Sequence, residues 1–404
     1  MVPALAALEE AYARLRAPAG QETQPGGGAD YGNAPSGGDV PGGPLIGYVG
    51  ADVPVELLTA AGFRPLRLTG DPGVPATLGD RYLGRGVDPA ARSVLTRLLT
   101  GAFGDLGRVV IGHDCEASLR LFYALRELRR IEPGAGVPEA YLVGVLHLPH
   151  RSTARYNRRR IGEFAARLAV WSGRPLDVAA AVRAHDERRR LLAAVAELRR
   201  AVPARLTGRE FLAAANAALP VAEHTALLGE LLAQAGRLPE HRGRRVFLSG
   251  SDHDTPHVYG AIEADGHVIV GEDHSFGDPQ AERRVGAGGL DSQAEHGVGA
   301  GGLDPQAEHG VGAGGLDVIA EHYHESGPAA QRATAAERAA HAAMAVRRCR
   351  AELFVSYART GDDAPAWDFP AQRAALDIPA VLLDRQDYGR ADLAALRKEE
   401  TCAG

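Results

Sequence analysis

The chain has 404 residues, more than one hydrophobic core usually serves, and its 45% hydrophobic and 24% charged residues exclude a protein disordered throughout. Its net charge of −6 disfavours a nucleic-acid-binding surface, and its three cysteines provide no disulfide framework. No apolar run reaches the roughly 20 residues that span a bilayer. We therefore expect a cytoplasmic protein of two or more domains, with neither nucleic acid nor membrane as a partner.

The N-terminal region divides into a helix and a linker. Residues 1–16 place alanine and leucine at helical spacing around Glu9 and Glu10, which predicts an amphipathic helix and not a secretory signal. Residues 17–44 are mostly glycine, proline and small polar residues, too poor in apolar surface to offset the entropy of ordering. We interpret them as a flexible linker.

Two stretches of the chain alternate between short apolar runs and helical patterns. The first stretch, residues 45–150, has predicted strands at 45–50, 65–68, 108–112 and 140–146, and predicted helices at 53–61 and 116–130. The second, residues 238–395, has predicted strands at 244–250, 266–271, 351–357 and 380–384, and predicted helices at 256–265, 329–350 and 370–376. Residues 151–237 contain four predicted helices and no strand signal. This order predicts an α/β fold in which a helical connector joins two doubly wound parallel-sheet domains.

Residues 278–316 are a tandem repeat inside the second predicted domain. Three copies of thirteen residues begin at Asp278, Asp291 and Asp304, and a decayed fourth copy begins at Asp317. Solenoid repeats generally run about 20 residues or longer and carry a hydrophobic stripe. These shorter, glycine-rich copies are more typical of an expanded surface loop.

Polar side chains follow three of the predicted strands. His113, Asp114 and Cys115 follow the strand at 108–112, residues 249–254 follow the strand core at 244–248, and residues 272–275 follow the strand core at 266–270. Ligands of parallel α/β domains bind beyond the carboxyl ends of the strands. Asp and Ser at such positions also cap helices, so both roles stay open for each single residue. Their coincidence at equivalent strand ends predicts a site among them.

Several segments, in this order, resemble the 2-hydroxyacyl-CoA dehydratase and benzoyl-CoA reductase family over about residues 45–390. The segments that carry the resemblance are 46–48, 54–65, Cys115 with 118–120, 148–150, Tyr156, 173–176, 245–250, 262–263, 266–268, 380–384 and 387–388. The resemblance implies two flavodoxin-like domains in one subunit of a heterodimer. It also implies a [4Fe–4S] cluster on three cysteines, an ATP-dependent activator that donates one electron, and dehydration of a 2-hydroxyacyl-CoA through a ketyl radical.

The chain departs from this family at the cluster positions. Cys115 matches the first ligand, but the second position falls at Ser275 and the third near Gly361 and Asp362. One cysteine alone does not hold a cubane cluster. Three readings remain open: a subunit that binds acyl-CoA while a homologous partner carries the cluster, a zinc or iron enzyme using histidine, cysteine and aspartate, or a non-catalytic scaffold subunit without a cofactor.

The candidate site residues follow from these readings. Cys115 is the expected cluster or metal contact, joined by His113 and His274 if the metal is zinc or iron. Ser275 and His274, on the facing loop, and Glu56 are the candidate catalytic residues. Glu56 is expected either to cap its helix or to face a cleft between the domains. Arg151 and Arg155 follow the strand at 140–146 and are candidates for contacting coenzyme A phosphates, with a role as plain surface arginines equally open.

Overall fold

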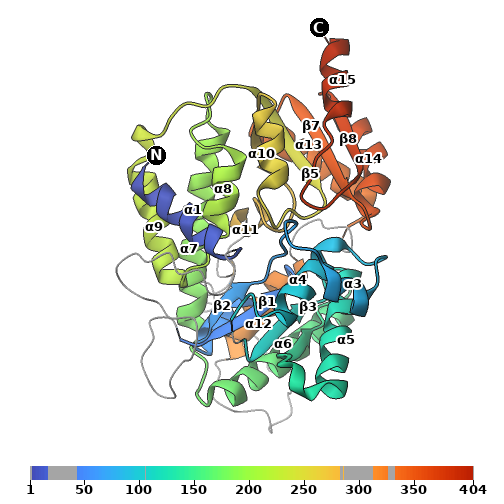
Figure 1. The fold of residues 1–404 in the computed structure, drawn as a ribbon. Coiled ribbons are helices and arrows are strands. Elements are labelled where there is room, and N and C mark those ends of the chain that lie inside the picture. The colour runs from blue at the N-terminus through green and yellow to red at the C-terminus, as the bar shows by residue number, and fades with distance from the viewer. Residues whose placement is uncertain are drawn as a thin grey trace.

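Two four-stranded parallel sheets form the framework of the protein (Figure 1). The computed structural model describes residues 2–16, 43–104, 106–282, 285, 313–325 and 333–403. The first sheet has the order β2-β1-β3-β4, with strands β1 (Leu45–Val49), β2 (Arg64–Arg67), β3 (Arg108–Gly112) and β4 (Glu139–Val143). The second has the order β6-β5-β7-β8, with strands β5 (Arg244–Gly250), β6 (His267–Glu272), β7 (Leu353–Arg359) and β8 (Ala380–Gln386). The predicted α/β class with two parallel sheets is confirmed.

Helices cover both faces of the first sheet because both faces of its strands are apolar. Val110 contributes to one core, whereas its neighbours Val109 and Ile111 contribute to the core on the opposite face. The helices of this unit are α2 (Val55–Ala60), α3 (Thr77–Leu83), α4 (Pro89–Leu99), α5 (Glu116–Ile131) and α6 (Arg151–Ser172), with a 3₁₀ turn at Pro133–Ala135. Helices α2 and α6 share the Val110 core, and α4 and α5 share the other.

The second sheet is covered in the same way. Phe247 of β5 packs against the face occupied by α13, whereas its neighbours Val246 and Leu248 pack against the face occupied by α10. The helices of this unit are α10 (His257–Ala264), α13 (Ala335–Cys349), α14 (Ala364–Ala375) and α15 (Ala394–Ala403). The short helix α11 (Pro279–Glu282) packs against the long helix α7 (Val178–Arg200) instead.

A third group of helices lies beside both sheets, at the left in Figure 1. It consists of α1 (Pro3–Arg14), α7 (Val178–Arg200), α8 (Gly208–Ala215) and α9 (Val221–Ala233), with a 3₁₀ turn at Ala235–Arg237. Leu5, Leu8, Leu192, Phe211 and Leu228 are fully buried in their common core. Helices therefore fill the whole of the predicted connector, but its first helix, α6, packs on the first sheet.

The chain crosses back to the first unit between β6 and β7. Helix α12 (Ala313–Glu325) contains the predicted fourth repeat copy and packs on α6 through the first unit's core. The predicted repeat loop is described only at its two ends. Asp278 at its start is buried in ion pairs with Arg199 and Arg200, and residues 286–312 lie outside the described residues, as do residues 17–42 of the predicted linker.

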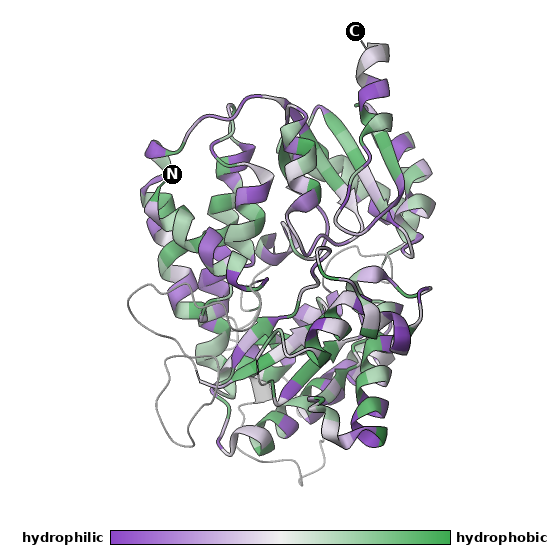
Figure 2. Cartoon of the chain, in the orientation of Figure 1, coloured by the Kyte–Doolittle hydropathy of each residue, from purple (hydrophilic) through white to green (hydrophobic). Residues whose placement is uncertain are grey.

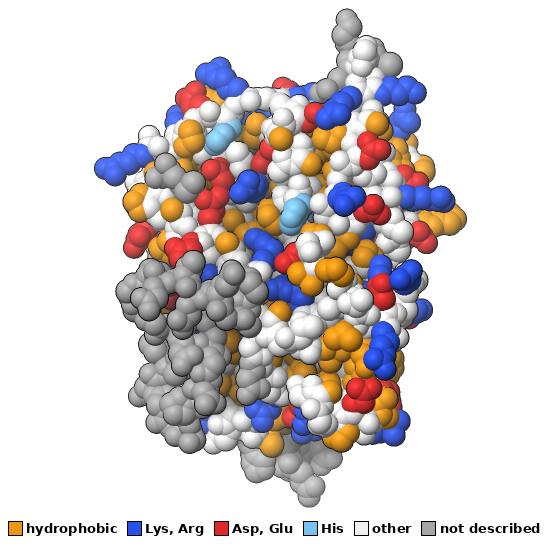
Figure 3. Space-filling model, in the orientation of Figure 1, with side chains coloured by type: hydrophobic (Ala, Val, Ile, Leu, Met, Phe, Trp, Pro, Cys, Tyr) orange, Lys and Arg blue, Asp and Glu red, His pale blue; other side chains and the backbone are white. Residues whose placement is uncertain are grey.

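Hydropathy follows this arrangement. The strands of both sheets are largely hydrophobic, and most helices carry one polar side (Figure 2). In the described residues, no helix combines the length and the apolar character needed to cross a membrane. On the described part of the face drawn in Figure 3, basic and acidic side chains are interspersed.

Candidate functional site

The carboxyl ends of the two sheets face each other, and Arg67 joins them. Arg67 ends β2, and its Nη2 and Nη1 donate to the hydroxyl (2.6 Å) and carbonyl oxygen (2.8 Å) of Ser275, which follows β6. The Ser275 hydroxyl donates to Asp252 Oδ2 (2.6 Å), and its backbone N–H donates to Oδ1 (2.7 Å). Burial opposes ionisation of Asp252, but His274, Arg67 and Ser275 together hold its pKa below the usual range. The Ser275 hydroxyl is therefore held between a guanidinium and a carboxylate.

The region where the carboxyl ends of the two sheets meet is called the junction below. Cys115 follows β3 at the carboxyl end of the first sheet and starts α5. Its sulfur caps this helix by accepting from Ser118 N–H (3.4 Å), and it also lies 3.2 Å from Ser118 Oγ. The residue is exposed, yet the surrounding protein desolvates the thiol and, with the charge of Asp114, raises the pKa of Cys115 to about 12. The thiol is therefore neutral near pH 7 unless a metal displaces its proton.

Asp114 connects the loop after β3 with the loop after β1. Its Oδ2 accepts from Ala51 N–H (2.7 Å), and any side chain at Gly50, whose φ is +98°, would collide with this carboxylate. Burial raises the pKa of Asp114, and the charge of Asp252 adds to the rise against the Ala51 hydrogen bond. The charges of Asp114 and Asp252, which follow β3 and β5, therefore influence each other.

The loop after β5 is also bonded to the end of β7 and the residues that follow it. Ser251 donates to Asp362 Oδ2 (2.7 Å), and Arg359 donates through Nη1 to the carbonyl oxygen of Asp252 (2.6 Å). Arg359 also holds Asp88 of the first unit through Nε (3.0 Å) and Nη2 (2.6 Å). Two of the three positions at which the family resemblance places cluster ligands, Ser275 and Asp362, are thus tied to the loop after β5.

His274 points away from this junction into the core. Its Nδ1 accepts from Phe276 N–H (3.3 Å), so its Nε2 is the donor to the Tyr259 hydroxyl at 2.6 Å. Desolvation lowers the pKa of His274 to about 4, which leaves the ring neutral. Both ring nitrogens are occupied, which disagrees with the expected roles of His274 as a metal ligand and a catalytic residue.

The expected histidine and cysteine metal site finds no support in the described part of the chain. No three His, Cys, Asp or Glu side chains gather there into a metal-binding group. His113 is half-buried next to Asp114, and His253 is buried against the rings of His274 and Tyr357.

Glu56 neither caps α2 nor faces the junction. It is fully buried, forms an ion pair with Arg189 of α7, and accepts from the Tyr323 hydroxyl of α12 (3.0 Å). Burial alone would raise the pKa of Glu56, but Arg189 and His185 hold it below the usual range. Both expected positions were wrong, because the carboxylate ties together helices that are distant in sequence.

Arg151 and Arg155 are exposed on the first two turns of α6, as expected for residues that follow β4. The loop before them holds a buried contact, in which His147 Nε2 and Asp52 Oδ2 lie 2.8 Å apart. This contact fixes the loop after β4 against the loop after β1. The two arginines therefore extend from a fixed base into solvent.

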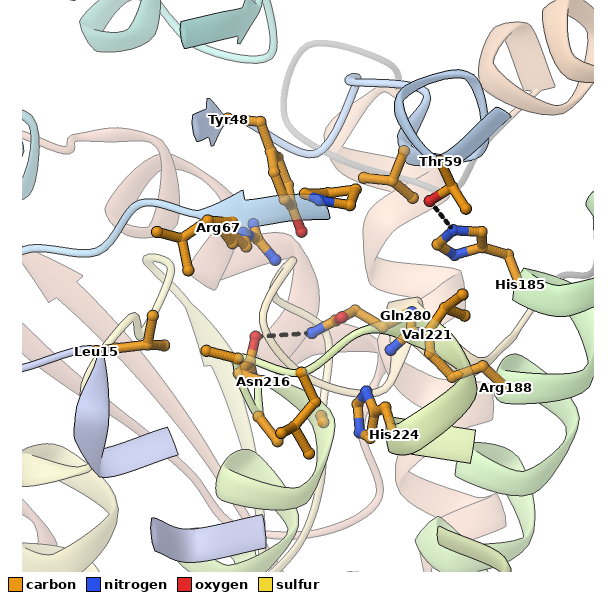
Figure 4. Close-up of a pocket in the computed structure, with 17 residues that line it drawn as sticks. Leu15, Tyr48, Thr59, Arg67, His185, Arg188, Asn216, Val221, His224 and Gln280 are labelled. Carbon is orange, nitrogen blue, oxygen red and sulfur yellow. Dashed lines mark hydrogen bonds between the residues drawn. The ribbon is translucent and has the colours of Figure 1, made fainter. Parts of the chain in front are cut away.

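A pocket of about 80 Å³ opens beside the junction, and its residues were not predicted (Figure 4). Tyr48 and Arg67 line it from β1 and β2, and His185, Arg188 and His224 line it from α7 and α9. The sequence offered one signal that went unused: Arg67 is a charged residue at the end of an apolar strand. The helix residues gave no signal, because their wall forms only when α7 packs against α2 and α9.

The family assignment rests on a match over most of the chain. A family model described as the 2-hydroxyglutaryl-CoA dehydratase D-component matches residues 51–398, a range that contains every strand except β1. The chain belongs to this family. No curated protein matches it.

A three-thiolate cluster of the kind implied for 2-hydroxyglutaryl-CoA dehydratase relatives does not fit the residues present. Of the three positions, only Cys115 offers sulfur. The other two carry oxygen side chains that are already engaged, since Ser275 is bonded to Arg67 and Asp252, and Asp362 accepts from Ser251. Cys349 is buried at the end of α13, with its sulfur against Gly271 of β6. Iron–sulfur clusters require several thiolates, so the described residues at these three positions do not supply the protein ligands for one.

Proposed function

We propose that this chain is the acyl-CoA-binding subunit of a two-subunit 2-hydroxyacyl-CoA dehydratase-type enzyme whose homologous partner carries the [4Fe–4S] cluster. The observation that supports it best is that one thiol, Cys115, and two engaged oxygen side chains, Ser275 and Asp362, occupy the three positions that the family resemblance gives to cluster ligands. The family's ATP-dependent activator would then serve the partner subunit.

Exposed arginines support a coenzyme A contact on this chain. Arg151 and Arg155 extend from the first two turns of α6, and the first turn of this helix carries no acidic residue. Guanidinium groups bind phosphate oxygens through charge-assisted hydrogen bonds. The helix N-terminus adds a favourable field for an anion.

The proposal is tested by producing the chain anaerobically, alone and together with the homologous subunit encoded beside it. We expect iron and acid-labile sulfide only in the complex. We also expect an Arg151→Gln/Arg155→Gln double variant to bind acetyl-CoA about tenfold more weakly by calorimetry. Arg159→Gln, an exposed arginine on the same helix paired with Glu163, is the matched control. Four irons in the isolated chain would refute the proposal that the partner subunit carries the cluster. An acetyl-CoA affinity unchanged in the double variant would refute the contact between the arginines and coenzyme A.

A further inference from the structure

The pocket beside the junction is lined by apolar residues and by polar side chains, none of which is acidic. Its lining contains two arginines, two histidines and a tyrosine, and neither Asp nor Glu occurs among the described residues that form it. Figure 4 shows Tyr48 and Arg67 on the strand side and Arg188 and His224 on the helix side. Pockets in proteins usually balance buried charge, so this composition calls for a negative partner.

Among the charged residues of the pocket, Arg188 has no acidic partner in the described part of the chain. Neighbouring Arg189 takes the buried carboxylate of Glu56, and Arg188 makes no hydrogen bond or ion pair with the described residues. Desolvation, with the charge of Arg189, lowers the pKa of Arg188 to about 10. Arg188 is half-buried, and a guanidinium brings five donors, so several of them are available to an anion in the pocket.

Two further donors and one histidine ring nitrogen around the pocket have no partner. The Tyr48 hydroxyl makes no hydrogen bond within the described chain, and burial raises its pKa, which keeps it protonated. Arg67 Nε and His185 Nδ1 are buried without a partner, although the other nitrogens of both side chains are bonded. Helix α9 begins at Val221, which also lines the pocket, so its free N–H groups add to the positive field.

We propose that this pocket binds one compact oxyanion, a carboxylate or a phosphoryl group, through Arg188 and the Tyr48 hydroxyl. Its volume of about 80 Å³ admits a few heavy atoms and excludes a whole nucleotide. Arg67 contacts both the pocket and Ser275, so the bound anion lies next to the junction without being part of it. The site is distinct from the exposed Arg151 and Arg155.

Calorimetric titration of the full chain at low ionic strength tests the site with inorganic phosphate and with acetate, against sodium chloride at equal ionic strength. We expect one equivalent of phosphate or acetate to bind and to raise the unfolding temperature with concentration. Phosphate alone would identify a phosphoryl ligand, and acetate a carboxylate ligand. Binding of neither probe overturns the proposal.

Variants then locate the bound anion. Arg188→Gln should weaken binding at least about tenfold, since it removes the charge-assisted bonds. Without anion, this variant should keep the unfolding temperature of the parent, because the half-buried Arg188 forms no hydrogen bond or ion pair with the described residues. Arg183→Gln, at an exposed position of the same helix, should bind as the parent does. Tyr48→Phe is a second, milder variant, with a several-fold loss expected. Equal affinity in Arg188→Gln or in Tyr48→Phe would overturn the assignment.

Discussion

Cys115 has a structural role as the N-cap residue of α5. Its sulfur is the N-cap acceptor of α5, a position that serine or aspartate more often fills. The carboxylate of Asp114 precedes it, and desolvation together with this charge disfavours the thiolate. An exposed cysteine is usually reactive only when its pKa is lowered, and here the pKa is raised.

We therefore expect Cys115 to be accessible but slow to alkylate near neutral pH. Only the thiolate attacks iodoacetamide, so a pKa of about 12 keeps the rate low at pH 8 and lets it rise through pH 10. Peptide-level mass spectrometry of the native protein at several pH values measures this rate, with glutathione as the free-thiol reference. A rate that levels off near pH 8.5, as for an ordinary thiol, would contradict the geometry described for Cys115.

Side-chain direction decided which site residues could be predicted. The strand-end rule drew attention to the loops of Cys115 and Ser275, which follow β3 and β6 in the structure. It failed for His274, because adjacent residues after a strand point to different sides and this ring points toward Tyr259. It could not find Asp88, whose partner Arg359 lies in the other unit and is 271 residues away.

Elements with buried apolar runs were predicted best. Strands β3 and β5 have the predicted bounds, because both run through two cores and contain few polar residues. Helix α4 was missed although Asp88 and Pro89 form a helix start, with Asp88 accepting from Ala90 N–H (2.8 Å). Helix α14 begins at Ala364, six residues before its predicted start, because Pro370 lies within the helix instead of opening it.

Helix α12 gives a prediction at the element scale. Ile319 is fully buried in the core shared with α6, so Ile319→Ala should destabilise the protein by about 2–4 kcal/mol. Glu321→Ala, at an exposed position of the same helix, should change stability by less than about 0.5 kcal/mol. Urea denaturation measures both. Equal midpoints for the two variants would show that α12 does not pack on the first unit.

At the scale of the whole molecule, direct polar contacts hold the two units together. Arg359 binds Asp88, Arg67 binds Ser275, and Asp254 Oδ2 accepts from Gly70 N–H at 2.7 Å. Burial raises the pKa of Asp254 against the influence of Arg359 and Gly70. These contacts could not be predicted from the sequence, because each joins residues of different units that are far apart in the chain.

Asp88→Asn tests how much one such contact contributes. Asparagine keeps the α4 cap but removes the charge that faces buried Arg359, so we expect a loss of about 3 kcal/mol in stability. Thermal and urea unfolding measure the loss. Asp265→Asn is the matched control, since Asp265 pairs with exposed Arg397 and should contribute less than about 1 kcal/mol. A loss no greater than the control's would mean that the Arg359 contact does not hold the units together.

The return of α12 to the first unit also has a consequence for biosynthesis. Strands β1 to β4 and helix α6 leave the ribosome long before residues 313–325 are translated. Until then, the side of α6 that α12 covers stays bare, and Glu56 and Arg189 lack the Tyr323 hydroxyl. The N-terminal unit therefore cannot mature first, as domains generally do, but must wait as an incomplete intermediate for most of the chain to emerge.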